Sequence, residues 1–106
     1  MKELNEMFDK QIEFQRKLNN DMFSQDFRTI MTLALIDEVT ESLRETPWKP
    51  WKKNQQFNKI NYQQELIDCW HFLINLTISS GMNSGMLYNL FMKKNLTNND
   101  RQKEGY

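Results

Sequence analysis

Helical periodicity with almost no interruption is the feature that most constrains this chain. Its 106 residues include only three glycines and two prolines. Apolar residues recur at three- and four-residue steps, the spacing of one face of an α-helix, and the strict alternation typical of strands is hard to find. A chain of this length is long enough for one domain and too short for two. The sequence therefore predicts a single all-α domain over residues 1–106.

Caps and helix breakers divide the chain into four predicted helices. Asp26 is a suitable N-cap for the second, and Pro47 ends it because proline cannot continue a helix. Asn61 forms a capping-box pattern with Gln64 at the start of the third, and Gly81 follows its end. We expect these helices to form a compact four-helix bundle followed by a polar tail. The predicted helices cover about residues 2–20, 26–46, 62–80 and 84–95, and the tail covers 96–106.

The composition excludes several classes of protein. Basic and acidic residues balance at 14 each, so no global field steers the chain toward nucleic acid or an anionic membrane. Cys69 is the only cysteine, which excludes an intramolecular disulfide and favours a reducing compartment. Neither a signal peptide nor a long apolar run is found. These features predict a soluble, cytoplasmic protein that binds neither nucleic acid nor membrane. Its limited core makes self-association a reasonable expectation.

Two of the predicted helices carry acidic residues where core residues are expected. The apolar stripe of the second helix runs through Met31 and Ala34 and then reaches Glu38 and Glu41. Such i, i+3 pairs lie on one helix face, with their Cβ atoms about 5–6 Å apart. One such pair alone is usually a solvated surface feature.

The third predicted helix repeats the anomaly, because Glu65 and Asp68 precede Phe72 and Leu76 on its stripe. If the two helices pack antiparallel about 8–10 Å apart, four carboxylates can converge on one point. Four buried anions are costly unless a cation neutralises them, so they either face solvent or hold a metal. Oxygen ligands favour Mg²⁺, and the single histidine and single cysteine argue against zinc.

The acidic pattern, together with three other segments, resembles the dimeric dUTPases, which belong to the all-α nucleoside triphosphate (NTP) pyrophosphatase, or MazG-like, superfamily. The carboxylates form D-E-x-x-E, 23 intervening residues and then E-x-x-D. The third helix reads ELIDCWHFLINL, close to the family's E-x-x-D-x-W-H-F. The other three segments are FQRKLNND (residues 14–21), WKPWKK (48–53) and KNLTNNDRQKEGY (94–106).

The resemblance implies Mg²⁺-dependent hydrolysis of dUTP to dUMP and pyrophosphate by a homodimer or homotetramer. Two or three Mg²⁺ ions are expected on Glu38, Glu41, Glu65 and Asp68, with Glu41 also the catalytic base. Base recognition falls to Gln15 and Asn19, whose amides offer both donors and acceptors. Phosphate binding falls to Lys94, Asn98, Arg101 and Tyr106 in the tail. Further substrate contacts are expected from Trp48, Trp51, Lys52 and His71.

Several alternatives stay open. Trp48 and Trp51 can stack on a base or form a hydrophobic plug. Only 25 residues separate Asp68 from Lys94, whereas well-known dimeric dUTPases carry a helical insertion there, so uracil specificity is less secure than the pyrophosphatase chemistry. A broader MazG-like pyrophosphatase acting on other nucleotides is one alternative. A non-enzymatic helical protein-interaction module is the other.

Overall fold

The computed structural model describes residues 2–105, and these residues form four α-helices without any strand. The predicted all-α, four-helix fold is therefore confirmed. No helix within this range combines the length and the apolar character needed to span a bilayer. The helices are α1 (Lys2–Lys17), α2 (Gln25–Arg44), α3 (Lys59–Ser79) and α4 (Ser84–Lys103).

The helix boundaries follow local capping chemistry. The predicted N-caps were wrong by two or three residues: Ser24 caps α2 by accepting the amide of Phe27, and Asn58 caps α3 by accepting that of Asn61. These side-chain oxygens pair with amides that have no partner within the helix. The second predicted helix was also too long, because α2 ends at Arg44.

The ends of the first and last helices also differ from prediction. Helix α1 stops at Lys17, and Asn19 adopts a left-handed backbone with φ of 57°. Helix α4 continues to Lys103 instead of ending at residue 95, so most of the predicted tail is helical. Residues 96–103 contain neither glycine nor proline, and Gly105, with φ of 77°, provides the left-handed conformation that follows many helix ends.

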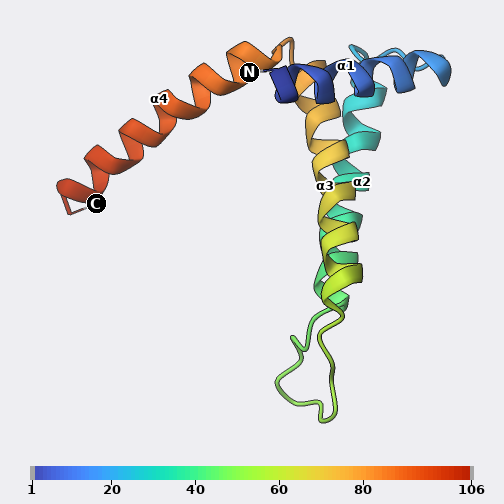
Figure 1. Cartoon of the computed structure of the whole chain (residues 1–106), viewed down its shortest axis with the longest axis vertical. Helices are drawn as coiled ribbons and strands as arrows, with labels where there is room; N and C mark the ends of the chain where they lie inside the picture. The colour runs from blue at the N-terminus through green and yellow to red at the C-terminus, as the bar shows by residue number, and fades with distance from the viewer. Residues whose placement is uncertain (1, 106) are drawn as a thin grey trace.

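Helices α2 and α3 form a long antiparallel hairpin closed by the loop of residues 45–58, and α1 crosses the other end of the hairpin (Figure 1). Where the three helices meet, apolar side chains form the core as in a helical bundle. The buried members are Phe8, Met22, Phe27, Ile74 and Ile78, packed against the partly buried Leu4, Ile12, Met31 and Leu87.

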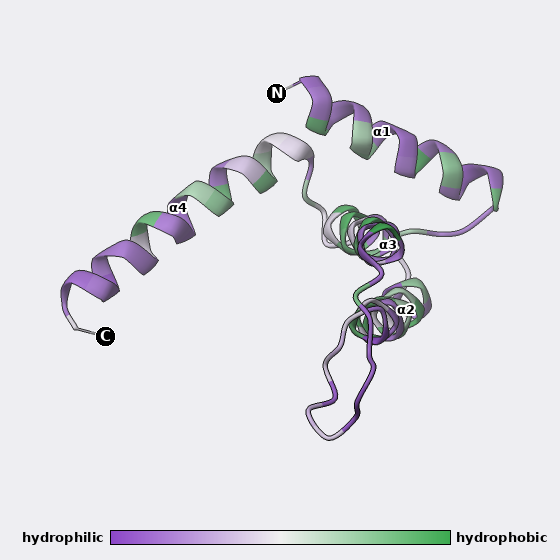
Figure 2. Cartoon of the chain, turned by 60° about the horizontal axis from the view of Figure 1, so that its bottom comes forward, coloured by the Kyte–Doolittle hydropathy of each residue, from purple (hydrophilic) through white to green (hydrophobic). Residues whose placement is uncertain are grey.

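Helix α4 extends away from the hairpin beside the start of α1 (Figure 1). It packs chiefly against α1, and the Ser84 hydroxyl donates a hydrogen bond to the Asn5 side chain. Apolar residues occur along much of its length (Figure 2), and among them Phe91 is 64% and Leu96 is 62% exposed. Within one chain, α4 therefore leaves much of its apolar surface uncovered.

Candidate functional site

The facing sides of α2 and α3 bring three acidic side chains together in the half of the hairpin nearer its loop. One carboxylate oxygen from each of Glu38, Glu65 and Asp68 lies within 4.8 Å of the others. The helical spacing explains this arrangement, because both pairs lie on the stripe that each helix turns toward its neighbour. Small side-chain rotations would let these oxygens share one hard cation or bridge two.

Glu38 is the most perturbed member of the acidic cluster, by which we mean Glu38, Glu41, Glu65 and Asp68. Its pKa is raised to about 7, first by burial and then by the Glu65 carboxyl, with which it can share a hydrogen bond only when protonated. The negative charges of Glu41 and Asp68 raise this pKa further. Its Oε2 atom is buried, and no donor within residues 2–105 reaches it. A buried carboxylate oxygen that has no donor and lies among other carboxylates would be stabilised by a bound cation.

Glu41 lies one turn further along α2 at the edge of the cluster. It is not among the three groups within 4.8 Å. Neighbouring carboxylates nevertheless affect its titration. The pKa of Glu41 is raised first by burial and then by the charges of Asp37 and Glu65. Glu41 therefore belongs to the cluster, and its carboxyl group lies close enough to Glu65 and Glu38 to share hydrogen bonds with them.

The cluster makes the stability of the metal-free protein depend on pH. Because the pKa of Glu38 is raised on folding, from 4.5 to about 7, the folded chain holds a proton that the unfolded chain releases. The stabilisation from this proton is complete below about pH 4.5 and is lost as the pH rises through about 7. With a chelator present, we expect a lower melting temperature at pH 8 than at pH 5, measured by circular dichroism. A higher melting temperature at pH 8 would contradict this account of the cluster.

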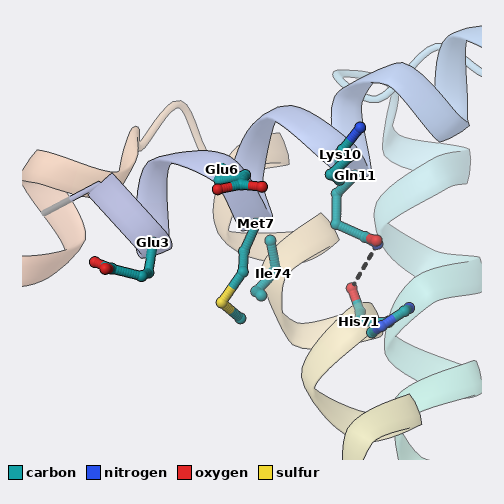
Figure 3. Close-up of a pocket in the computed structure, with 7 residues that line it drawn as sticks. All are labelled: Glu3, Glu6, Met7, Lys10, Gln11, His71 and Ile74. Atoms are coloured by element: carbon teal, nitrogen blue, oxygen red, sulfur yellow. Dashed lines mark hydrogen bonds between the residues drawn. The ribbon is translucent and has the colours of Figure 1, made fainter.

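A cavity of about 390 Å³ opens between α1 and α3, lined by Glu3, Glu6, Met7, Lys10, Gln11, His71 and Ile74. We call it the α1–α3 pocket (Figure 3). Its volume lies within the range of small-molecule sites. His71 follows Asp68 by one helical turn, so the pocket begins about 5 Å along α3 from the acidic cluster. The pocket and the cluster are therefore neighbours along α3, although none of the four cluster residues lines the pocket.

The two predicted base-recognition residues lie outside the lining of the α1–α3 pocket. Gln15 is only 4% exposed, and its Oε1 accepts a hydrogen bond of 2.7 Å from Asn20. Asn19 is exposed at the turn after α1. The spacing that placed them on one helical face fails because the helix ends before Asn19.

The predicted aromatic and basic residues of the loop lie at the closed end of the hairpin. Trp48 and Trp51 contact each other edge to face, with ring centroids 5.8 Å apart. The ammonium of Lys49 lies 5.7 Å from the ring centre of Trp48. Lys52 lines a separate cavity of about 340 Å³ that is formed mostly by loop residues. The loop closes the end of the hairpin that is opposite α1 (Figure 1).

The predicted phosphate-binding residues do not join the acidic cluster within one chain. Lys94, Asn98 and Arg101 lie on the far half of α4, which points away from the hairpin (Figure 1). Tyr106 lies outside the described residues. On α4 these three residues continue a stripe with Leu87 and Phe91, because all five follow at three- and four-residue steps.

Comparison with known proteins assigns the family. The sequence profile of the dUTPase family matches residues 1–87, which is most of the chain. The chain belongs to the dUTPase family. The matched range includes α1, the hairpin and all four residues of the acidic cluster. The resemblance inferred from the motifs is confirmed.

Two relatives of this dUTPase-family chain are phage proteins. It is 27% identical over 100 residues to the dCTP pyrophosphatase of Enterobacteria phage T4, covering 81% of this chain and 57% of that protein. It is 38% identical over 71 residues to the dCTP pyrophosphatase of Enterobacteria phage LZ5, covering 56% and 41%. The chain thus spans about half the length of these relatives. No solved structure matches it.

Two polar residues of this dUTPase-family chain escaped the sequence interpretation. Gln11, on α1, is 9% exposed. Asn75, on α3, is 2% exposed. The sequence signal that could have identified them is the same one that identified the carboxylates: a polar residue on the apolar face of a predicted helix. Asn75 interrupts an otherwise apolar face, and Gln11 adjoins the stripe formed by Phe8 and Ile12.

Proposed function

We propose that this protein is a Mg²⁺-dependent nucleoside triphosphate pyrophosphatase that hydrolyses dUTP to dUMP and pyrophosphate. The observation that carries the proposal is the convergence of Glu38, Glu65 and Asp68 around a buried carboxylate oxygen without a donor. A protein that evolved only to fold would gain by replacing such a group with an apolar residue. Membership of the dUTPase family supports the choice of substrate.

The donor set fits a hard divalent cation. Glu38, Glu65 and Asp68 offer only carboxylate oxygens, which Mg²⁺ prefers, and Glu41 lies within reach as a fourth ligand. Two or three ions would be held here. When bound, Mg²⁺ would neutralise triphosphate oxygens and the charge that develops during phosphoryl transfer.

Glu41 is the proposed general base. Its raised pKa brings it closer to neutrality, where a carboxylate accepts a proton from water more readily. Its place at the edge of the cluster leaves it able to orient a water molecule beside the phosphates. Glu38, Glu65 and Asp68 then serve mainly as ligands, and we assign a contact with the sugar to His71, one turn further along α3.

We also propose that the active protein is a homo-oligomer, a dimer or a tetramer. The solvent-accessible surface is 8453 Å², whereas a compact monomer of 12.9 kDa exposes about 6,300 Å². The excess, about 2,000 Å², exceeds the roughly 800 Å² that each partner contributes to a standard interface. A second copy would cover this surface.

The outer face of α2 is the proposed centre of that interface. Leu33 is 62% and Ile36 is 58% exposed, and Leu43 follows Ile36 by one heptad. This face of α2 points away from α3. A helix that is apolar on both sides is normally buried on both sides. Docking two hairpins would also let α4 of one copy approach the acidic cluster of the other, supplying Lys94, Asn98 and Arg101.

A second candidate substrate is dCTP. Both phage relatives are dCTP pyrophosphatases. Cytosine and uracil differ at two adjacent positions: N3 accepts and the C4 amino group donates in cytosine, whereas N3–H donates and the C4 carbonyl accepts in uracil. The chemistry at the phosphates is the same for both.

Pyrophosphate release from dUTP, dCTP, dTTP and UTP, with Mg²⁺ and with a chelator, tests the proposal. We expect turnover of dUTP that stops completely when the metal is chelated. Preference for dCTP would favour the second candidate, and comparable turnover of all four would indicate a broader MazG-like enzyme. Absence of turnover across the panel would refute the enzymatic function and favour a protein-interaction module.

A further inference from the structure

We infer that the loop between α2 and α3 binds single-stranded nucleic acid through its lysines and its exposed aromatic rings. Residues 46–64 contain four lysines and no acidic residue, although the chain as a whole is neutral. The balanced net charge predicts no long-range attraction to nucleic acid, but a local surface of one sign attracts an anion that comes within a Debye length of it. We call it the basic loop surface, and it consists of Trp48, Lys49, Trp51, Lys52, Lys53, Phe57 and Lys59.

The aromatic rings of the basic loop surface are open to contact. Trp51 is 71%, Phe57 is 52% and Trp48 is 42% exposed. Large apolar side chains that are exposed together, rather than singly, mark a surface that binds a partner. Unpaired bases of any sequence stack on rings of this kind, because every base has a π-face.

The order of residues along the loop matches the repeat of a single strand. The segment reads WKPWKKNQQFNK (residues 48–59), and each aromatic residue is followed by a lysine one or two positions later. A strand alternates bases with phosphates, so this order offers a ring for a base and a charge for a neighbouring phosphate. A segment that enters a membrane needs a continuous apolar face, whereas the longest apolar run here is Pro50 and Trp51.

The cavity of about 340 Å³ beside these rings suits a phosphate group. Three cationic side chains line it, and none of its lining residues is acidic: Arg44, Thr46, Trp48, Lys49, Lys52, Gln55 and Gln56. Arginine offers a planar fork and lysine a point charge, and both complement phosphate oxygens. One phosphate of the strand would occupy this cavity while adjacent bases lie on the exposed rings.

The amide of Gln55 holds the loop in one shape. Its Oε1 accepts the backbone N–H of Lys49 at 3.1 Å, and its Nε2 donates to the backbone carbonyls of Lys49 and Lys52. The ammonium of Lys49 also lies 5.7 Å from the ring centre of Trp48, which favours a cation–π contact. A surface that is already formed loses little conformational entropy when a ligand binds.

This inference goes beyond the proposed function and does not depend on it. The acidic cluster lies between the facing sides of α2 and α3, whereas the basic loop surface closes the end of the hairpin (Figure 1). Trp48, Trp51 and Lys52 are also predicted substrate contacts. The test therefore changes only members of the surface without a predicted role in the reaction, which are Lys53, Phe57 and Lys59.

Fluorescence anisotropy of a labelled oligothymidylate of about 12 nucleotides, a length within the range of single-strand sites, tests the inference. Hydroxyl ends and a chelator keep terminal phosphates and metal from directing it to the acidic cluster. We expect a Kd of about 1–100 µM at physiological salt. Lys53→Gln combined with Lys59→Gln should raise the Kd about tenfold and lower the slope of log K against log salt by about 1.4. Phe57→Leu should raise the Kd at least about fivefold through lost stacking.

Lys17→Gln combined with Lys93→Gln is the matched control, because it removes the same charge from exposed positions on α1 and α4. It should leave the Kd and the salt slope unchanged. A duplex of equal length should bind more weakly, because its base faces are covered.

Three results would overturn the inference: a duplex that binds as tightly as the single strand, a Kd unchanged in both folded loop variants, or binding to phosphatidylserine vesicles without binding to the oligonucleotide. A protein that binds the oligonucleotide but releases no pyrophosphate would support this inference and count against the proposed function alone. A protein that turns over dUTP without binding the oligonucleotide would do the reverse.

Discussion

Replacing Glu38 with glutamine should abolish Mg²⁺-dependent pyrophosphate release and at the same time raise the melting temperature of the metal-free protein at pH 8. Glutamine keeps the shape of the side chain but removes a charge that is destabilised by burial and by three neighbouring carboxylates. We expect activity to fall at least about 100-fold, because even residues that only support metal ligands cost about 10–100-fold when mutated.

The gain in stability distinguishes a functional residue from a structural one. Relief of the charge repulsion should contribute on the order of 1 kcal/mol, which corresponds to about 4–8 °C in a domain of this size. Circular dichroism melts with and without Mg²⁺ measure it, and the stabilisation by Mg²⁺ should be lost in the variant. The dependence of metal-free stability on pH between 5 and 8 should also weaken.

Glu45→Gln is the control for this experiment, because Glu45 caps the same helix but lies outside the acidic cluster. It should keep both the activity and the response to Mg²⁺. A Glu38→Gln protein that melts lower than wild type without metal, or that still responds to Mg²⁺, would show that Glu38 supports the fold and does not bind the ion.

Replacing Ile36 with aspartate should separate the proposed oligomer into single chains. Ile36 is 58% exposed within one chain and lies at the centre of the outer α2 face. Burying an unpaired carboxylate there, together with the loss of apolar contact, should cost about 2–5 kcal/mol per site. Size-exclusion chromatography with light scattering should detect the change in mass, and the melting temperature should fall.

Asn54→Asp introduces the same charge into the exposed loop and should leave the mass unchanged. Activity gives a second readout. If α4 of a partner supplies phosphate-binding residues, the separated chains should lose turnover even where they remain folded. A wild-type protein that is monomeric at micromolar concentration, or an Ile36→Asp protein with unchanged mass, would refute the proposed interface.

The helices and the convergence of carboxylates were predictable because both depend on local periodicity. A stripe at three- and four-residue steps identifies the face that a helix buries, and an acidic residue on that face is unusual in any arrangement of the chain. Glu38, Glu65 and Asp68 do meet between the helices, although their role as metal ligands stays a prediction. The end of α4 was predicted too early because asparagine-rich sequence is a poor helix former but does not stop a helix as proline does.

The sequence by itself determined an all-α fold and two acidic faces, because helical spacing and charge are properties of neighbouring residues. Only the tertiary structure decided which polar residues share a pocket and which do not. Gln11 and Asn75, 64 positions apart, meet because α1 crosses the end of the hairpin. The residues on α4 stay apart from the cluster because α4 leaves the hairpin and packs beside α1. Contacts of this kind depend on how helices cross, which no local pattern specifies.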